Sequence, residues 1–456
     1  MVTTAIPADI RSLPLAPKSP LSYWDRLRCA RAFDTGPERI RDAGGPVTRV
    51  ILGPKPLVPP AVFVTSPQGA HDVLGRTDAF ADRGEMPISK DFRHLLGGNL
   101  LILPHEEWLP RRRAMQPMFT KQHVRRYAGH MATAAEDICR SWGDDDVDLD
   151  VQCRKLTLRA LGRSVLGVDL DQRADEVGPA LRTALEWLAD RAVQPVRAPR
   201  WLPTPGQRRA RAAKRVLHEL AADILDACRA DPELDAPLVR ALIALTDPRT
   251  GMPLTDREIC DELVLFMLAG HDTTSTTITY ALWALGHHQA LQDRVLVEVA
   301  ELGDRPLTTD DVPRLGFTVQ VLHEALRLCP PAPVISRMVM QDIDVDGCRV
   351  AAGSAAIVGV YAMHRDPALW EDPLEFDPDR FSRQRSEGRS RWQYLPFGGG
   401  PRSCIGDHFA MLEATLALAT IVRHVDIRSL DRDFATDVPF TTVAAKPIRA
   451  RARQRI

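Results

Sequence analysis

The amino-acid sequence predicts a mainly α-helical protein with a minor β lobe, an α+β fold. The longest helical pattern, residues 255–287, is apolar nearly all round, which is typical of a buried central helix. Residues 105–245 are rich in Ala, Leu, Arg and Glu at helical spacing. Runs of β-branched residues fall mainly within residues 45–80 and 334–362. These two stretches are therefore expected to contribute to the small β lobe.

The whole chain, residues 1–456, is interpreted as a single domain, because no Gly/Ser-rich linker, low-complexity run or repeat interrupts its apolar patterning. It begins with a Pro-rich segment over about residues 1–40. Strands are predicted from Val47 (VTRVILG) and from Ala61 (AVFVTSP), followed by a short helix over residues 68–74. Several helices are expected over residues 105–245, with proline-containing breaks near residues 195–205.

The C-terminal half has clear start and stop signals. A Thr-Asp-Arg-Glu capping box at Thr255 opens the central helix, and a second helix, from about Pro313, ends before Pro330. Strands are predicted over residues 335–340 and 355–363, with a hairpin at Asp346-Gly347 between them. A coil and a Gly-rich loop then lead into a last helix over residues 407–425.

The composition narrows the function classes. A hydrophobic fraction of 45% and a charged fraction of 26% are those of a globular protein, and a net charge of −1 gives no global attraction for nucleic acid. The first 40 residues contain neither a long apolar run nor a signal-peptide pattern, so a cytoplasmic protein without a membrane anchor is expected. The 8 cysteines form no CxxC pairs, which argues against a zinc ribbon or a disulfide framework. A single functional cysteine is the simplest interpretation.

That cysteine is Cys404, in the loop FGGGPRSCIG over residues 397–406. The loop directly precedes a helix N-terminus, whose N–H groups and dipole favour a thiolate. Its glycines allow the backbone to fold tightly around the sulfur and to approach a flat cofactor. By mechanism alone, the same loop also suits a nucleophilic cysteine.

Two further sequence patterns each allow a functional and a purely structural interpretation. Glu324 and Arg327 share one helix face at i, i+3, but alone such a pair is more often a solvated surface pair. In AGHDTT, residues 269–274, a glycine and consecutive threonines are poor helix formers, so a local distortion of the helix is expected. The structural alternative is that the threonines bond back to helix carbonyls.

Together, these patterns resemble the cytochrome P-450 family from about residue 45 to the C-terminus. The loop residues that carry the resemblance are Phe397, Gly398, Gly400, Arg402, Cys404 and Gly406. The resemblance implies heme b lying between the central helix and the cysteine loop, with Cys404 as the axial iron ligand. Thiolate ligation favours O–O cleavage. Phe397 would shield the sulfur, and Arg402 would meet a haem propionate.

The resemblance also implies roles for residues outside the loop. Arg380 in FDPDRF would complete a structural triad with Glu324 and Arg327. Arg337 would bind a propionate, and Trp108 and Arg112 would contact the propionates from the opposite side. This last match is looser, because Pro110 is placed in the first helical turn and His105 or Arg111 competes for the contact.

On the central helix, the resemblance places Ala269 and Gly270 beside the haem. Thr273 would donate a hydrogen bond where oxygen binds, and Asp272 would control proton delivery. His271 occupies a variable position of the family pattern and is interpreted as a packed or exposed histidine, not an iron ligand.

The function that follows is a monooxygenase. It would activate O2 with two electrons and insert one oxygen atom into an apolar organic substrate, with lipid or terpenoid suggested. The expected pocket is lined by residues 82–103, 187–201, 265–273, 334–335 and 438–442. Alternatives are a haem-thiolate isomerase or dehydratase, a peroxide-driven enzyme, or a non-catalytic haem-binding protein. The Asp272-Thr273 pair speaks against the isomerase and peroxide-driven alternatives.

Electrons would come from NAD(P)H only indirectly, through a reductase and a ferredoxin or flavodoxin. The arginines expected to form a positive face for such an acidic donor are Arg380, Arg383, Arg385, Arg389, Arg391 and Arg111, Arg112, Arg113. Solvated helix faces are the common alternative for such clusters, and also the preferred interpretation of the basic stretch 197–215. No nucleic-acid partner is expected, and the protein is expected to be a monomer.

Overall fold

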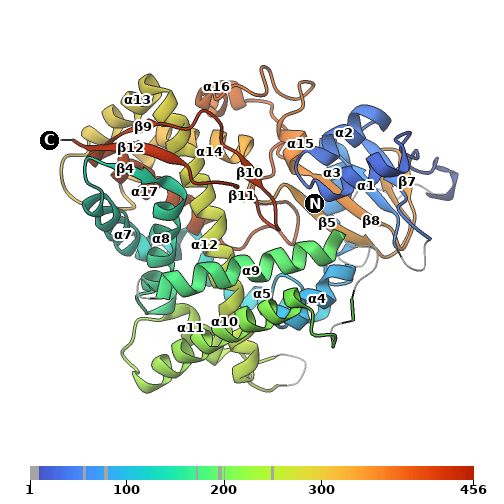
Figure 1. Ribbon diagram of the computed structural model, residues 1–456, viewed down its shortest axis with the longest axis horizontal. Helices are drawn as coiled ribbons and strands as arrows, with labels where there is room; N and C mark the ends of the chain where they lie inside the picture. Colours follow the sequence, from blue (N-terminus) through green and yellow to red (C-terminus); the bar gives the residue numbers. More distant parts are fainter. Residues whose placement is uncertain are drawn as a thin grey trace.

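The computed structural model describes residues 10–54, 58–76, 81–170, 173–193, 198–199, 201–247 and 251–455. Most strands and the N-terminal helices form a lobe at the right of Figure 1, and the larger helical part fills the remainder. The expected α+β architecture with a minor β lobe is confirmed. The predicted break near residues 195–205 and the basic stretch 197–215 lie partly outside the described residues.

The β lobe is built on a five-stranded sheet with the order β1-β2-β8-β5-β3. Its strands are β1 (Val47–Val50), β2 (Ala61–Val64), β3 (Ala81–Asp82), β5 (Val334–Val339) and β8 (Ala355–Gly359). β2 and β8 run parallel, with Phe63 opposite Ile357, whereas the other neighbours are antiparallel. The central strands thus join the two sequence stretches that were expected to share this lobe.

Three helices and a hairpin complete the lobe. The helices are α1 (Tyr23–Arg31), α2 (Thr35–Gly44) and α3 (Pro67–Leu74), so the Pro-rich segment contains one helix and most of a second. The hairpin joins β6 (Ile343–Val345) to β7 (Cys348–Val350), and both turn residues have a positive φ, 51° at Asp346 and 77° at Gly347. The prediction of a strand through residue 363 is wrong beyond Gly359, because α15 (Val360–His364) follows.

The helical part surrounds the long helix α12 (Asp256–His287), which runs through the centre of the molecule (Figure 1). The capping box at its start is present: the Thr255 side chain accepts from the Glu258 N–H, and the Glu258 carboxylate accepts from the Thr255 N–H. Most residues of α12 are buried on every side, because α8 (Leu149–Leu161), α10 (Pro205–Ala230), α14 (Gly316–Leu328) and α17 (Asp407–His424) pack against it. The predicted central helix is confirmed.

The remaining α-helices are α4 (Pro87–Leu96), α5 (His105–Met115), α6 (Lys121–Val124), α7 (Ala128–Ser141), α9 (Ala174–Val193), α11 (Pro237–Ala244), α13 (Gln289–Ala300) and α16 (Arg383–Ser386). Short 3₁₀ turns occupy Ile10–Ser12, Gln116–Phe119, Arg125–Tyr127, Val312–Arg314 and Pro378–Phe381, and α8 continues into a π-helical turn over Gly162–Leu166. Within the described residues, no helix is both long and apolar enough to span a membrane.

The C-terminal strands were not predicted. β9 (Val425–Ser429) and β4 (Asp146–Asp148) flank β12 (Arg449–Gln454) in a three-stranded sheet, and β10 (Thr436–Asp437) pairs with β11 (Val443–Ala444). β12 has the sequence RARARQ, in which only small alanines face inward. It therefore lacks the β-branched and aromatic residues that mark a strand.

Candidate active site

A cavity of about 850 Å³ lies between α12 and the loop that contains Cys404. Its lining is mainly apolar and includes residues from all five segments expected from the sequence. It also includes residues outside those segments, among them, on α1 and its neighbourhood, Tyr23, Leu27, Ala30, Arg31, Phe33, Leu52 and Val58. The sequence of α1 was interpreted only as part of the Pro-rich segment, and it contains nothing that ties these residues to a cavity.

The cysteine loop adopts the tight conformation that its glycines allow. The Cys404 N–H donates to the carbonyl of Phe397 at 2.9 Å, which closes the loop. Gly398 and Gly400 have φ values of 71° and 73°, in the left-handed region that favours glycine. At Gly400, a Cβ atom would come within 1.8 Å of the Leu74 carbonyl oxygen. A side chain there is excluded both by conformation and by space.

Cys404 is the exposed cysteine of this protein, whereas Cys348 is half-buried and the other six are buried. Its exposed surface faces the cavity, deep inside the protein. Burial raises the pKa of the Cys404 thiol above its usual value, although the Gly406 N–H, Arg112 and Arg83 act to lower it. Without a bound cation, desolvation thus opposes the thiolate that the helix N-terminus and the loop N–H groups favour. A bound metal cation would supply the missing stabilisation.

Arginines from five segments line the cavity: Arg31, Arg83, Arg112, Arg337 and Arg402. Arg112 donates to the Ser403 carbonyl at 2.9 Å, and its buried Nε has no hydrogen-bond partner within the part of the chain that the structure describes. Arg337 donates to the Ser336 carbonyl at 2.9 Å. This group contains the three arginines that were expected at haem propionates.

On α5, the structure directs Arg111 and Arg112 to different places. Arg111 is buried and pairs with Glu262 at 3.1 Å and with Glu258 at 3.0 Å, which directs it toward the start of α12. Arg112 lines the cavity, as does the buried Trp108. Pro110 lies inside α5 and not in its first turn.

The middle of α12 forms one wall of the cavity through Ala269, Gly270 and Thr273. The helix runs unbroken here, so the expected distortion is not found. The Thr273 hydroxyl donates to the Ala269 carbonyl at 2.7 Å, as the structural alternative predicted. The presence of glycine at position 270 is explained by packing, because a Cβ atom there would lie 2.9 Å from the Leu161 side chain of α8. Thr273 thus both bonds back to its helix and reaches the cavity.

Asp272 is buried and does not line the cavity; it forms an ion pair with Arg154 of α8. Arg154 also donates to Asp150 at 2.8 Å, and one buried atom of each, Arg154 Nη2 and Asp150 Oδ1, has no hydrogen-bond partner among the described residues. The neighbouring His271 is buried, and burial lowers its pKa to about 4. The structure therefore separates Asp272 from Thr273 and gives it a partner that sequence reasoning missed.

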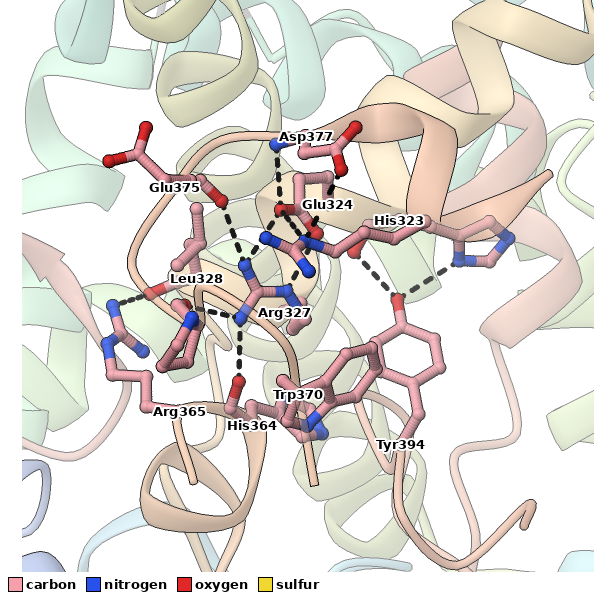
Figure 2. Close-up of polar contacts among 12 residues, drawn as sticks. His323, Glu324, Arg327, Leu328, His364, Arg365, Trp370, Glu375, Asp377 and Tyr394 are labelled. Carbon is pink, nitrogen blue, oxygen red and sulfur yellow. Dashed lines mark hydrogen bonds and ion pairs between the residues drawn. The ribbon is translucent and has the colours of Figure 1, made fainter. Parts of the chain in front are cut away.

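Glu324, Arg327 and Arg380 are brought together as expected. Figure 2 shows the contact between Glu324 and Arg327. Arg327 is fully buried and donates to both carboxylate oxygens of Glu324 at 2.7 Å. Arg380 Nε lies 3.3 Å from Glu324 Oε1. The solvated surface pair that was considered as an alternative is therefore excluded.

Hydrogen bonds from the triad connect α14 to α15 and to the coil that follows it. Arg327 donates to the carbonyls of His364 and Pro373 at 2.7 Å and of Glu375 at 3.1 Å, and its guanidinium lies 5.1 Å from the ring centroid of Trp370. These bonds radiate from the centre of Figure 2. The triad is positioned to hold the coil before the cysteine loop and does not line the cavity.

The residues present fit a haem. Cys404 faces the cavity, and the unpartnered buried Nε of Arg112 is a donor available to an anionic group at the cavity edge. Gly406 also lines the cavity, and a Cβ atom there would meet no protein atom within 4 Å, so this space is left open beside the sulfur. A fold and a site of this kind fit a haem-thiolate protein.

Comparisons with known proteins agree with this interpretation of the fold and the site. The sequence profile of the cytochrome P450 family matches residues 33–448. The chain is 32% identical over 411 residues to cyclooctatin synthase of Streptomyces melanosporofaciens, covering 89% of this chain and 88% of that protein. It is 31% identical over 383 residues to pentalenene oxygenase of Streptomyces avermitilis, covering 83% and 84%. The solved structure of retinoic acid-bound cyanobacterial CYP120A1 matches with a TM-score of 0.83 at 24% identity, over 97% of this chain and 100% of that chain.

The chain therefore belongs to the cytochrome P450 family. It is an oxidoreductase that incorporates oxygen, and its family implies a haem-thiolate cofactor, a redox partner and an apolar substrate.

Proposed function

We propose that this protein holds heme b through Cys404 and inserts one oxygen atom from O2 into a terpenoid or another apolar lipid, by hydroxylation or epoxidation. One observation carries the proposal: Cys404 faces an apolar cavity whose edge is lined by arginines and whose wall contains Thr273. Haem, when bound, supplies O2 activation and oxygen transfer. The name of the relative pentalenene oxygenase supports a terpenoid substrate.

The residues that would hold the cofactor divide by position. Arg112, Arg337 and Arg402 would neutralise the propionates through charge-assisted hydrogen bonds. Phe397 would shield the sulfur from water. The remaining contacts are assigned to Trp108, Ala269, Gly270, Gly398 and Gly406.

Proton delivery would be divided between two neighbours on α12. The Thr273 hydroxyl reaches the cavity and can turn from the Ala269 carbonyl to donate there. Asp272 faces α8 and would carry protons inward only when its carboxylate separates from Arg154. Arg154 would thus set how often Asp272 is available.

The electron donor would be a ferredoxin or flavodoxin, reduced by NAD(P)H through a reductase. The expected positive face is smaller than the sequence indicated, because Arg111 and Arg380 are buried in ion pairs and Arg385 pairs with Asp377 at 2.7 Å. Arg389 is half-buried against the rings of Trp370 and Phe381. The exposed arginines that remain for docking are Arg113, Arg383 and Arg391.

The test of donor docking reverses these three charges together. Arg113→Glu, Arg383→Glu and Arg391→Glu in one variant should weaken ferredoxin binding and reduce its salt dependence. Binding that is unchanged in affinity and salt dependence would exclude this face.

The test of the proposed function uses purified protein with ferredoxin, a reductase, NADPH and ¹⁸O2, with pentalenene as the first probe of a terpene panel. Substrate-dependent NADPH consumption and one ¹⁸O atom per product are expected, and both should be lost in Cys404→Ala. A rearranged product without ¹⁸O would contradict the proposal in favour of an isomerase or dehydratase. Turnover with peroxide but not with the donor system would favour a peroxide-driven enzyme.

A further inference from the structure

We propose that Asp82 is a positioning residue of the haem site, which orients Arg402 and places a fixed negative charge behind it. This inference rests on the proposed function, because it concerns the haem that Cys404 would hold. It predicts that Asp82 lowers the reduction potential of the bound haem and slows haem loss. No sequence motif had indicated this residue.

The geometry of the pair is specific. Arg402 Nη2 donates to Asp82 Oδ1 at 3.0 Å, and Arg402 Nη1 donates to the Leu103 carbonyl at 2.8 Å. The guanidinium carbon lies 4.4 Å from the ring centroid of Trp108. Asp82 Oδ1 is itself fixed by the N–H of Gly84 at 3.1 Å. Arg402 is thereby held between a carboxylate, a carbonyl and an aromatic face.

Both partners are removed from solvent and come from different parts of the fold. Their side chains are 3% exposed at Arg402 and 8% exposed at Asp82. Asp82 belongs to β3, opposite Met338 of β5, the strand that also carries Arg337. Arg402 lies two residues before Cys404 in the cysteine loop. The pair therefore connects the sheet edge to the loop that holds the sulfur.

The charges at the cavity explain why this carboxylate matters beyond packing. Among the described residues, every charged residue that lines the cavity is an arginine: Arg31, Arg83, Arg112, Arg337 and Arg402. Asp82 is a carboxylate ion-paired with one of these arginines, Arg402. Because a buried ion pair contributes little net stability compared with apolar packing, stability alone does not account for it.

A fixed anion near the iron has a predictable electrostatic effect. It stabilises the ferric state, which carries one more positive charge, relative to the ferrous state. For a unit charge roughly 10 Å away and an effective dielectric constant of about 20, the equilibrium constant for one-electron reduction changes on the order of tenfold. Holding Arg402 in place also slows haem release, because its guanidinium need not be ordered on binding.

The decisive variant is Asp82→Asn, which keeps the shape of the side chain and removes its charge. Asp82→Glu keeps the charge, and Asp91→Asn is a matched control, since Asp91 forms a comparable buried pair with Arg191 at 2.9 Å on α4 and α9. The readouts are the midpoint potential, from spectroelectrochemical titration, and the rate of haem transfer to excess apomyoglobin. The wild type is first shown to hold thiolate-ligated haem by its carbon monoxide spectrum.

We expect Asp82→Asn to raise the midpoint potential, so that the equilibrium constant for one-electron reduction increases on the order of tenfold. We also expect this variant to release haem several times faster than the wild type. Asp82→Glu and Asp91→Asn should leave the potential near that of the wild type. An unchanged potential in a haem-loaded Asp82→Asn, or an equal shift in Asp82→Glu, would overturn the proposal. If Asp82→Asn binds no haem, retention in Asp82→Glu supports the charge-based role, and loss in both overturns it. A wild type without thiolate-ligated haem would instead contradict the proposed function.

Discussion

Replacement of Glu324 by Gln should destabilise the protein strongly, although Glu324 does not line the cavity. Its carboxylate accepts four hydrogen bonds: two from Arg327 at 2.7 Å, one from Arg380 at 3.3 Å and one from the Asp377 N–H at 3.0 Å. Gln would turn an NH₂ group toward arginine donors and leave the fully buried Arg327 without its counter-charge.

The magnitude follows from the burial of this group. Breaking a buried ion pair by removing one partner costs about 3–5 kcal/mol, a large part of the roughly 5–15 kcal/mol that stabilises a typical domain. The conservative Glu324→Gln change should therefore lower the urea midpoint and the fraction of protein that retains haem. Exposed Glu387→Gln, in the coil before the cysteine loop, is the matched control and should change neither.

Urea unfolding followed by far-UV circular dichroism, with haem absorption recorded in parallel, measures both effects. A Glu324→Gln variant with wild-type midpoint and haem content would refute the reasoning. It would mean that the coil before the cysteine loop is held by contacts other than this triad.

Three further predictions concern the site. Asp272→Asn should reduce the turnover rate about 100-fold or more while substrate binding persists, because proton delivery is lost; turnover near the wild-type rate would exclude that role. Arg112→Leu should weaken haem binding at least several-fold without loss of helical content, because a donor at the cavity edge is removed; unchanged haem titration would contradict this. Burial raises the pKa of Glu262 from 4.5 to about 7, so its protonated form is favoured in the folded state and its contribution to stability is lost as pH rises from about 4.5 through 7. The Tm of the wild type should therefore fall relative to that of Glu262→Gln between pH 5 and about 8, and parallel Tm curves would contradict the assignment.

The elements that the sequence predicted well have local signals. The capping box at Thr255 and the prolines after α14 act within a few residues, as does the Asp346-Gly347 turn. The sequence signal of the cysteine loop is also local, because Gly398 and Gly400 are needed for the backbone conformation of the loop itself. Such features depend only on neighbouring residues, so they can be predicted from the sequence.

The features that sequence reasoning missed depend on distant partners. β12 pairs with β4 about 300 positions earlier, as in the Arg449–Asp148 register, and its own residues have low strand propensity. Residues 360–363 have strand-like residues, but their helix α15 places the carbonyl of His364 where Arg327 binds it. In both segments, tertiary contacts determine the secondary structure.

The same limit applies to the site. The sequence placed Asp272 beside Thr273 and so suggested a shared surface, but adjacent helical residues point about 100° apart. The partner that turns Asp272 away, Arg154, lies on another helix and has no motif around it. Likewise, Asp82 is joined to Arg402 only by the fold, across 320 positions.

The most direct test of the central claim is the absorption spectrum of the dithionite-reduced, carbon monoxide-bound protein, compared between wild type, Cys404→Ala and the control Cys348→Ala. We predict a strongly red-shifted Soret band in the wild type and in the Cys348→Ala protein, and its loss in Cys404→Ala. A histidine-like band in the wild type, or a red-shifted band that survives in Cys404→Ala, would contradict Cys404 as the axial ligand.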